Sequence, residues 1–469
     1  MKKYLRFLII LFVVLYGFTF FTPAADQIAS AANTNVYVAP TVTGDGSGSD
    51  WNNQAQWSAV ALTRGNTYFL ADGTYGGRNL YTAETETALI TIKKATQSQH
   101  GIDAGWQTSY GDGVATFTSG FIISTGYWAF DGVTGSGKTG HGFHVDMTSQ
   151  AGVNNAFYIV ASYVTLAHTK ISWPDRDGEA YMNETSTSAG IEIYGNYTGI
   201  TLQYDYLEEI PGFPLRMLGG TDFLMEYCVF DGMHSDAVRH SSGVIVRNGN
   251  SSNGILRYNK LMNTEGSYTI GFYTDGAVHD GWKIYGNLFV WDSSSSKTGT
   301  TIPLGVNDGP DVVILKNSVF YNNTIADLRI SHKSEGKVLM GTGTGNTVYN
   351  NLFYGTNLLL SATHDYNSTY HNTATYCTSG ATAHEKGIIV RQPADCDYLD
   401  ATYDRNPFAA SGSGDFTLAA AEDAGIPLGS TYNVDMLGNT RTNWTRGAYE
   451  YAGTEDAIPP AAPTGLSVR

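Results

Sequence analysis

The feature that most constrains this chain is a short phrase that recurs after residue 160. Each copy alternates apolar and polar residues, as a half-buried strand does, and turn residues follow it. The copies read TLAHTKI, TLQYDYL, LMEYCVF, ILRYNKL, KIYGNLF, ILKNSVF and TVYNNLF, and they end at Ile171, Leu207, Phe230, Leu261, Phe289, Phe320 and Phe353. Their irregular spacing, from 23 to 36 residues, indicates a solenoid whose coils share a core and differ in their loops.

A second column of the repeat is polar. Two places before the final apolar residue stand Thr169, Asp205, Cys228, Asn259, Asn287, Ser318 and Asn351. If the coils stack at the strand spacing of ~4.8 Å, these side chains can hydrogen-bond from coil to coil. No helical period and no leucine-rich signature accompanies the phrase. The repeat therefore predicts an all-β parallel solenoid, the class that contains the β-helices.

The two ends of the solenoid are expected to differ from its coils. Residues 52–65, NNQAQWSAVALTRG, form an amphipathic pattern that predicts an N-terminal capping helix over the exposed core. The strands are expected to start in NTYFLADGTY, residues 66–75. Residues 414–429 and 436–451 are expected to close the other end.

The N-terminus resembles an export signal. Basic residues at Lys2, Lys3 and Arg6 precede the apolar run 7–21, and Ala-Ser-Ala at 29–31 offers a cleavage site. The run is shorter than the ~20 residues that span a bilayer. We therefore predict a signal peptide at 1–31, a β-helix domain at 32–452, and a Pro/Ala-rich linker at 453–469 that leads into a further module. The mature protein is expected to be secreted or to lie at the cell surface, with no segment inserted in the membrane.

Charge limits the partners. Residues 1–31 hold three basic residues and one acid, so their removal brings the net charge from −16 to −18. Nucleic acids and anionic membranes bind cationic surfaces, so neither is an expected partner. An acidic polysaccharide would need a local Arg/Lys patch or bound cations.

One stretch imitates a phosphate-binding loop. Gly132, Gly137, Lys138 and Thr139 have the spacing G-x-x-x-x-G-K-T. Such a loop must open a helix whose N-terminus faces the phosphate, and no helical period follows Thr139. We therefore predict a glycine-rich turn and no nucleotide cofactor.

The terminal phrases carry a family resemblance. The chain contains YVAP, GDGSGSDWNN and YFLADGTY near its start and DFTL and GAYEY near its end. In these it resembles the secreted bacterial right-handed parallel β-helix proteins of the pectate-lyase-like superfamily, over most of residues 34–452. The resemblance implies a protein that processes or binds polysaccharide, most often by β-elimination of uronic-acid polymers and sometimes by hydrolysis. We expect it to be a monomer. The paired-Asp motifs of polygalacturonases and the RxPxxR element of pectate lyases are absent.

The densest group of candidate site residues lies in residues 226–243. β-Elimination needs a group that neutralises the uronate carboxylate, a base for the C5 proton and a proton for the departing oxygen. We predict His234 or Arg239 as the base and Arg216 as the carboxylate partner. Ca²⁺ is a possible cofactor, and oxygen ligands suit it. Its predicted ligands are Asp231, Asp236 and Glu209.

Other readings of the same residues stay open. Acids and arginines outside a solenoid also form plain ion pairs across coils, and Asp231 with Asp236 or with Glu209 would suit a glycoside hydrolase. Secondary candidates lie in residues 278–283 and 331–337. Four tryptophans are candidates for stacking on sugars: Trp106, Trp128, Trp173 and Trp282. The leading hypothesis is a polysaccharide lyase, and the alternative is a non-catalytic glycan-binding or adhesion β-helix.

Overall fold

The computed structural model describes most of the chain from residue 34 to residue 451. The described ranges are 34–149, 155–173, 189–234, 242–264, 266, 268–273, 276–293, 302–306, 313–329, 335–360, 362–371, 385–386, 403 and 405–451. The predicted signal peptide and the predicted linker both lie outside these ranges.

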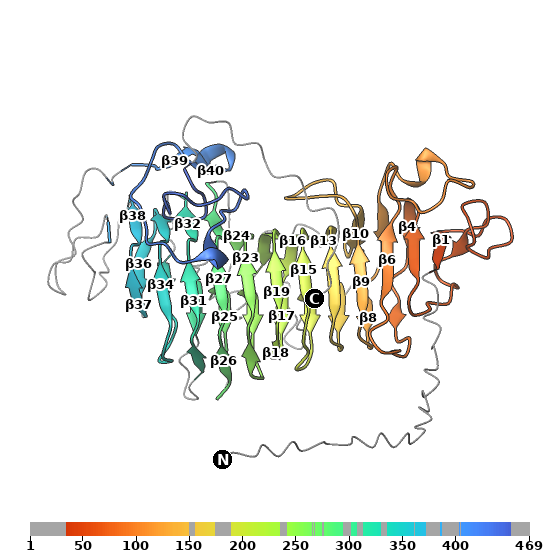
Figure 1. Cartoon of the computed structure of the whole chain (residues 1–469), viewed down its shortest axis with the longest axis horizontal. Helices are drawn as coiled ribbons and strands as arrows, with labels where there is room; N and C mark the ends of the chain where they lie inside the picture. The colour runs from red at the N-terminus through yellow and green to blue at the C-terminus, as the bar shows by residue number, and fades with distance from the viewer. Residues whose placement is uncertain are drawn as a thin grey trace, which may run out of the picture.

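Three long parallel sheets run along the molecule, and a short fourth sheet lies beside its middle coils (Figure 1). Sheet A has 13 strands, in the order β2 (Ala55–Gln56), β1 (Asn35–Ala39), β3 (Thr67–Leu70), β6 (Ile90–Lys94), β9 (Trp128–Asp131), β12 (Val164–Ala167), β15 (Thr201–Gln203), β19 (Leu224–Glu226), β23 (Ile255–Arg257), β27 (Lys283–Tyr285), β31 (Val319–Tyr321), β34 (Thr347–Tyr349) and β37 (Thr363–Asp365). Sheet B has 11 strands, in the order β4 (Gly73–Tyr75), β7 (Ala115–Phe117), β10 (Phe143–Asp146), β13 (Thr169–Ser172), β16 (Tyr206–Pro211), β20 (Val229–His234), β24 (Lys260–Thr264), β28 (Leu288–Trp291), β32 (Thr324–Asp327), β35 (Leu352–Tyr354) and β38 (Ser368–Tyr370).

The other two sheets follow the same order along the molecule. Sheet C has 10 strands: β5 (Asn79–Leu80), β8 (Phe121–Ile123), β11 (Phe157–Ile159), β14 (Ala189–Ile193), β17 (Phe213–Met217), β21 (Ser242–Val246), β25 (Tyr268–Phe272), β29 (Ile302–Val306), β33 (Glu335–Val338) and β36 (Asn357–Leu360). Sheet D has four: β18 (Gly220–Thr221), β22 (Ser251–Ser252), β26 (Val278–Asp280) and β30 (Ile314–Lys316). Outside the solenoid, β39 (Phe408–Ala410) pairs antiparallel with β40 (Asp415–Leu418). Short 3₁₀ turns are η1 (Thr108–Tyr110), η3 (Ser411–Ser413) and η4 (Ser430–Tyr432).

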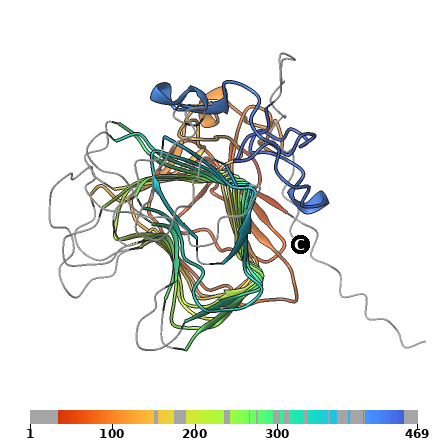
Figure 2. The same cartoon turned by 90° about the vertical axis from the view of Figure 1, so that its left-hand side faces the viewer.

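Each coil contributes one strand to sheets A, B and C in turn. β12, β13 and β14 form one coil, and they pair in parallel with β15, β16 and β17 of the next. A view along the long axis shows the sheets enclosing a common interior (Figure 2). The predicted all-β parallel solenoid is confirmed. Among the described residues, no helix is long and apolar enough to cross a membrane.

The repeat phrase supplies the apolar core of sheet B with one exception. Ile171, Leu207, Phe230, Leu261, Phe289 and Phe353 all belong to sheet B and are at most 1% exposed. Phe320 is equally buried but lies on β31 of sheet A, opposite Ile284. Its place in the sheet B column is taken by Ile325, which pairs with Phe289 and Phe353. The alignment of the repeat phrases placed Phe320 in the wrong sheet because two neighbouring strands of this coil, VFY and TIAD, have the same alternation of residues.

The polar column forms a buried ladder of side-chain hydrogen bonds. Each member accepts from the backbone N–H of the preceding member: Asn259 Oδ1 from Cys228, Asn287 Oδ1 from Asn259, Asn323 Oδ1 from Asn287, Asn351 Oδ1 from Asn323 and Asn367 Oδ1 from Asn351, at 2.9–3.0 Å. Asp205 Oδ1 accepts in the same way from the N–H of Thr169 at 2.9 Å, so the predicted ladder is confirmed for Asp205, Asn259, Asn287 and Asn351, while Cys228 joins it through its backbone N–H. Ser318 also bonds from coil to coil, but in a different column, between sheets D and A. Its hydroxyl accepts from the N–H of Trp282, and its own N–H donates to Asn346 Oδ1, both at 3.0 Å.

The predicted N-terminal capping helix is wrong. Residues 52–65 contain turns and the short strand β2, which pairs with β1 at the end of sheet A. Asp50 explains the local outcome, since its Oδ1 accepts from the N–H groups of Asn52 and Asn53 at 2.9 and 3.0 Å. Such side-chain bonds compete with helix formation, and pairing with β1 satisfies the backbone of an otherwise open sheet edge. The buried Trp57 still covers the core, so the segment caps the solenoid without a helix.

The C-terminal segment, residues 405–451, packs on the outward side of sheet B. Figure 1 shows it, in blue, beside the strands from β24 to β38. Its apolar side chains, among them Phe408, Phe416 and Tyr449, share a cluster with outward residues of sheet B such as Leu288 and Leu352. The two C-terminal phrases were expected to close the end of the solenoid. They instead cover the side of its last coils.

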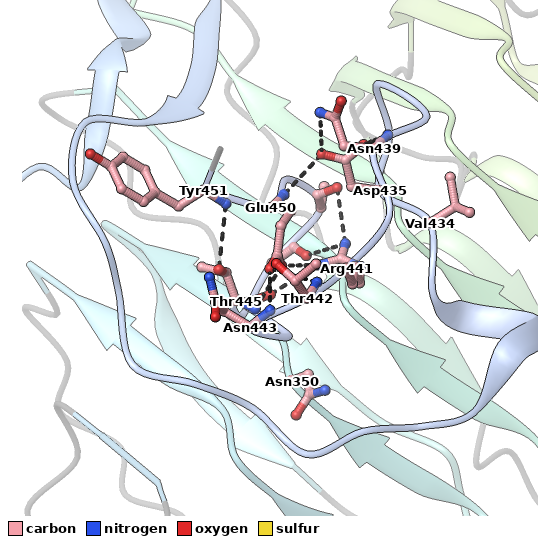
Figure 3. Close-up of polar contacts among 12 residues, drawn as sticks. Asn350, Val434, Asp435, Asn439, Arg441, Thr442, Asn443, Thr445, Glu450 and Tyr451 are labelled. Carbon is pink, nitrogen blue, oxygen red and sulfur yellow. Dashed lines mark hydrogen bonds and ion pairs between the residues drawn. The ribbon is translucent and has the colours of Figure 1, made fainter. Parts of the chain in front are cut away.

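A buried polar clamp holds this segment in shape (Figure 3). Arg441, 3% exposed, donates to the carbonyl oxygens of Thr445, Gly447 and Ala448 at 2.8–3.1 Å. The Glu450 carboxylate accepts from the N–H groups of Asn443 and Thr445 at 2.7 and 2.8 Å. Residues 436–451 therefore have a structural role.

Candidate functional site

Three of the predicted site residues are fully described, and they lie on two different sheets. Asp231 on β20 and Glu209 on β16 belong to adjacent strands of sheet B. Arg216 lies on β17 of sheet C, where its Nε donates to Glu192 Oε1 at 2.9 Å. Both members of that pair are buried. The structure thus brings Asp231 and Glu209 together and places Arg216 elsewhere, with its charge already matched.

The remaining predicted residues lie beyond the described part of the chain. His234 ends β20, but its side chain is not among the described ones. Arg239 and Asp236 belong to residues 235–241, which fall outside the described ranges. The roles assigned to these residues from the sequence stay predictions.

The described carboxylates offer calcium only part of a coordination shell. Asp231 Oδ1 accepts from Asn263 Nδ2 at 2.8 Å, and Oδ2 accepts from the Lys138 ammonium. Ca²⁺ takes six to eight oxygen ligands, so a calcium ion at Asp231 would have to share its carboxylate with Lys138. Within the described residues there is no group of three or more His, Cys, Asp and Glu side chains placed to hold a metal ion.

Around Asp231, the outward face of sheet B carries two rows of polar residues. Strand register aligns His144, Lys170 and Tyr206 in one row, on β10, β13 and β16. The same register aligns Asp146, Ser172, Glu208 and Asp231 in the second row. Neighbouring strands lie ~4.8 Å apart, so these side chains form a single patch, which we call the sheet B patch.

Hydrogen bonds tie the sheet B patch together. The Glu208 carboxylate accepts from the Tyr206 hydroxyl at 2.7 Å through Oε1 and pairs with Lys170 Nζ at 2.6 Å through Oε2. His144 Nε2 lies 2.8 Å from the Ser172 hydroxyl. The side chains of Lys170 and Glu208 are 30% and 34% exposed. The patch is therefore ordered by its own bonds, and a ligand can still reach it.

Burial and charge set the protonation of the patch. Burial lowers the pKa of His144 below its ordinary value of 6.5, and the nearby Lys170 charge adds to this while Asp146 opposes it. Burial also raises the pKa of Tyr206, as does its bond to Glu208. Although burial alone would raise the pKa of Glu208, the bonds from Lys170 and Tyr206 lower it. At neutral pH the patch thus holds a neutral imidazole, a protonated phenol and a carboxylate.

The glycine-rich stretch forms a loop over this face. Residues 132–142 connect β9 to β10 (gold in Figure 1, beside β10). The loop therefore leads into a strand and not into a helix, and the predicted glycine-rich turn is confirmed. Its base is fixed by histidines: His168 Nδ1 lies 2.8 Å from Gly135 O, and His141 Nε2 lies 2.9 Å from Tyr204 O. At its tip, Lys138 reaches Asp231, three strands away from β10 in sheet B.

The secondary candidates are mainly structural where they are described. Trp128, Trp173 and Trp282 are buried in the core, whereas the half-buried Trp106 stacks on His100 with ring centres 4.1 Å apart. In residues 278–283, His279 is fully buried and bonded to Ser251. Residues 331–334 lie outside the described ranges.

Sequence reasoning missed most of the sheet B patch, although the repeat contains the signal. Lys170, Tyr206 and Lys260 stand one place before the final apolar residue of their copies, and Glu208 and Asp231 stand one place after it. In a strand these flanking positions face away from the core. The repeat positions on either side of the final apolar residue therefore predict these patch residues, whereas the loops that follow each copy do not.

No family model and no curated protein matches the chain. Among solved structures, the crystal structure of pectate lyase Pel9A matches with a TM-score of 0.48 and 15% identity, covering 90% of this chain and 97% of that one. The alginate lyase AlyGC of family PL6 matches with a TM-score of 0.24 and 11% identity, covering 76% and 54% of the two chains. By its own strand pairing, the chain is a parallel β-helix protein.

Proposed function

We propose that this protein is a polysaccharide lyase that cleaves a uronic-acid polymer by β-elimination on the sheet B patch. The observation that carries the proposal is the alignment of His144, Lys170 and Tyr206 on three adjacent strands, with Glu208 bonded to two of them. A base, a cation and a proton donor thus occupy one row, in which Lys170 is partly exposed and Tyr206 is buried beside it. The predicted export signal suits a polymer substrate outside the cell.

The three tasks of β-elimination can be assigned to this row. The Lys170 ammonium faces the uronate carboxylate and stabilises the charge that develops as the C5 proton leaves. His144, neutral because burial lowers its pKa, takes that proton. The C4–O bond then breaks, a C4–C5 double bond forms, and the departing oxygen takes a proton from Tyr206. Glu208 positions both Lys170 and Tyr206.

Hydrolysis is the second candidate, on a different observation. Glu208 and Asp231 are direct partners on adjacent strands of sheet B. Two carboxylates a few ångströms apart are the requirement for glycoside hydrolysis. In this protein, however, both carboxylates are held by lysines, Glu208 by Lys170 and Asp231 by Lys138. A general acid needs a raised pKa, whereas the bond from Lys170 lowers the pKa of Glu208.

The test is to incubate the protein with pectate, alginate and chondroitin and to follow two products. Unsaturated uronate, seen by its ultraviolet absorbance, is expected with one of these polymers, and His144→Gln is expected to lower kcat about 10²-fold or more. His100→Gln, a change in a loop near the N-terminus, serves as the matched control. New reducing ends without unsaturated product would establish hydrolysis instead. Binding of a polymer without either product would show a glycan-binding protein.

A further inference from the structure

Two lysines, Lys138 and Lys260, lie near one another at the edge of the sheet B patch. Lys138 pairs with Asp231, and its side chain is 43% exposed. Lys260 on β24 stands next to Val229 of β20, in the row that contains Tyr206. Within the described part of the chain, the Lys260 ammonium has no ion pair or hydrogen bond. Burial lowers the pKa of Lys260, and repulsion from the nearby Lys138 adds to this, while Asp415 of the C-terminal segment opposes it.

The loop that carries Lys138 is built to hold its tip in place while leaving it accessible. Its base residues Gly132, His141 and Gly142 are buried, whereas Lys138, Thr139 and Gly140 at the tip are exposed. Across the tip, Ser136 and Thr139 form a short antiparallel bridge. The fixed ends of the loop set where the Lys138 ammonium lies. Because the tip is exposed, the remaining N–H groups of this ammonium are accessible to a ligand.

Asp231 is oriented from its other side. Asn263, 9% exposed, donates to Asp231 Oδ1 at 2.8 Å and to Asp292 Oδ2 at 2.9 Å. Asp231 Oδ2 is thereby turned toward Lys138. The lysine is held at the edge of the patch in the absence of any ligand, so little ordering is needed when a ligand arrives.

We propose that Lys138 and Lys260 form a carboxylate-binding subsite for the acidic sugar next to the one that is cleaved. The subsite lies beside the patch along the long axis of the solenoid, because Glu208 and Asp231 are partners on adjacent strands and Lys260 is on the strand after. A polymer lying along that axis would present one uronate to Lys170 and a second to this pair. The ligand class is therefore a polysaccharide with closely spaced carboxylates. This inference rests on the proposed function.

The experiment compares the double variant Lys138→Gln/Lys260→Gln with wild type on the cleaved polymer and on the same polymer with its carboxylates methyl-esterified. Loss of charge-assisted bonds predicts a KM for the acidic polymer that is about tenfold higher or more, with kcat within about twofold. Weak binding of the esterified polymer should be equal in both proteins. Lys316→Gln, a change at an exposed ion pair with Asp280, is the control. The charge-conserving variant Lys138→Arg/Lys260→Arg should retain most of the affinity for the acidic polymer.

The outcomes separate the two proposals. An active wild type whose KM is unchanged in the double variant overturns the subsite and leaves the lyase standing. A wild type that cleaves no polymer but binds the acidic one, with binding weakened in the double variant, supports the subsite and overturns the lyase. A wild type that neither cleaves nor binds a polyuronate overturns both.

Discussion

Lys138 and Asp231 form an ion pair although they lie 93 residues apart in the chain. The pair joins the tip of a loop near β10 to a strand three places further along sheet B. Asn263 holds the other oxygen of the carboxylate. The glycine-rich loop and the row of repeat residues thereby become parts of one surface.

Calcium binding at Asp231 is predicted to compete with Lys138, since ion and ammonium would share one carboxylate. Calorimetric titration of CaCl₂ into wild type and Lys138→Gln should therefore show tighter binding in the variant. Equal affinities, or no heat in either protein, would argue against a calcium ion at Asp231. Asp236 and Glu209, the other predicted ligands, would then have other roles.

The pH dependence of cleavage should report the neutral state of His144. Burial lowers its pKa below 6.5, so the imidazole remains unprotonated, and able to act as a base, on the acidic side of that value. We expect kcat/KM of wild type to fall only below pH 6.5, and this acid limb to disappear in His144→Gln. A limb centred above pH 6.5 would contradict the assignment of His144 as the base.

Asn287 is predicted to be essential for stability. Its Oδ1 accepts from the backbone N–H and Nδ2 of Asn259, both at 3.0 Å, inside the core. Asn287→Ala leaves the buried backbone N–H of Asn259 without an acceptor and removes one of the two acceptors of its Nδ2, at a cost of about 2–4 kcal/mol in the free energy of unfolding. Urea denaturation measures the change. Asn79→Ala, at an exposed position on β5, should shift the midpoint little, and similar losses in both variants would refute the ladder as a stabilising element.

Asp205 occupies a ladder position with a carboxyl in place of an amide. Its Oδ1 accepts from the N–H of Thr169 at 2.9 Å, while its Oδ2 is buried without a hydrogen-bond partner. Burial raises the pKa of Asp205 well above its ordinary value, so the folded state favours the neutral acid, whose Oδ2–H can act like the amide of an asparagine.

The stabilising effect of that proton should depend on pH. It is fully present below the unfolded-state pKa of ~3.9 and is lost as pH rises toward the higher folded-state value. Asp205→Asn keeps the donor at every pH, so at pH 7 we expect a variant more stable than wild type by about 1–3 kcal/mol. Thermal unfolding from pH 4 to pH 8 checks this. A difference between the two proteins that does not grow with pH would contradict it.

The sequence by itself determined the solenoid, because a half-buried strand must alternate and a shared core demands the same apolar column in each coil. It also determined the asparagine ladder, since a small polar side chain next to a strand can satisfy backbone groups of the neighbouring coil. It could not fix register where two adjacent strands carry the same alternation, and Phe320 and Ser318 were misplaced for that reason. Residues 52–65 show that a segment with an amphipathic helical pattern can instead form a strand when it pairs with the edge of a sheet.

Only the tertiary structure decided which charged residues meet. Arg216 and Asp231 are close in sequence, yet the turn between sheets B and C sends them to different faces. Lys138 is distant in sequence, yet the loop after β9 crosses the coils and places it on Asp231. Stacking turns positions about one coil apart into neighbours ~4.8 Å away, so His144, Lys170, Tyr206 and Glu208 form one patch that local sequence cannot reveal.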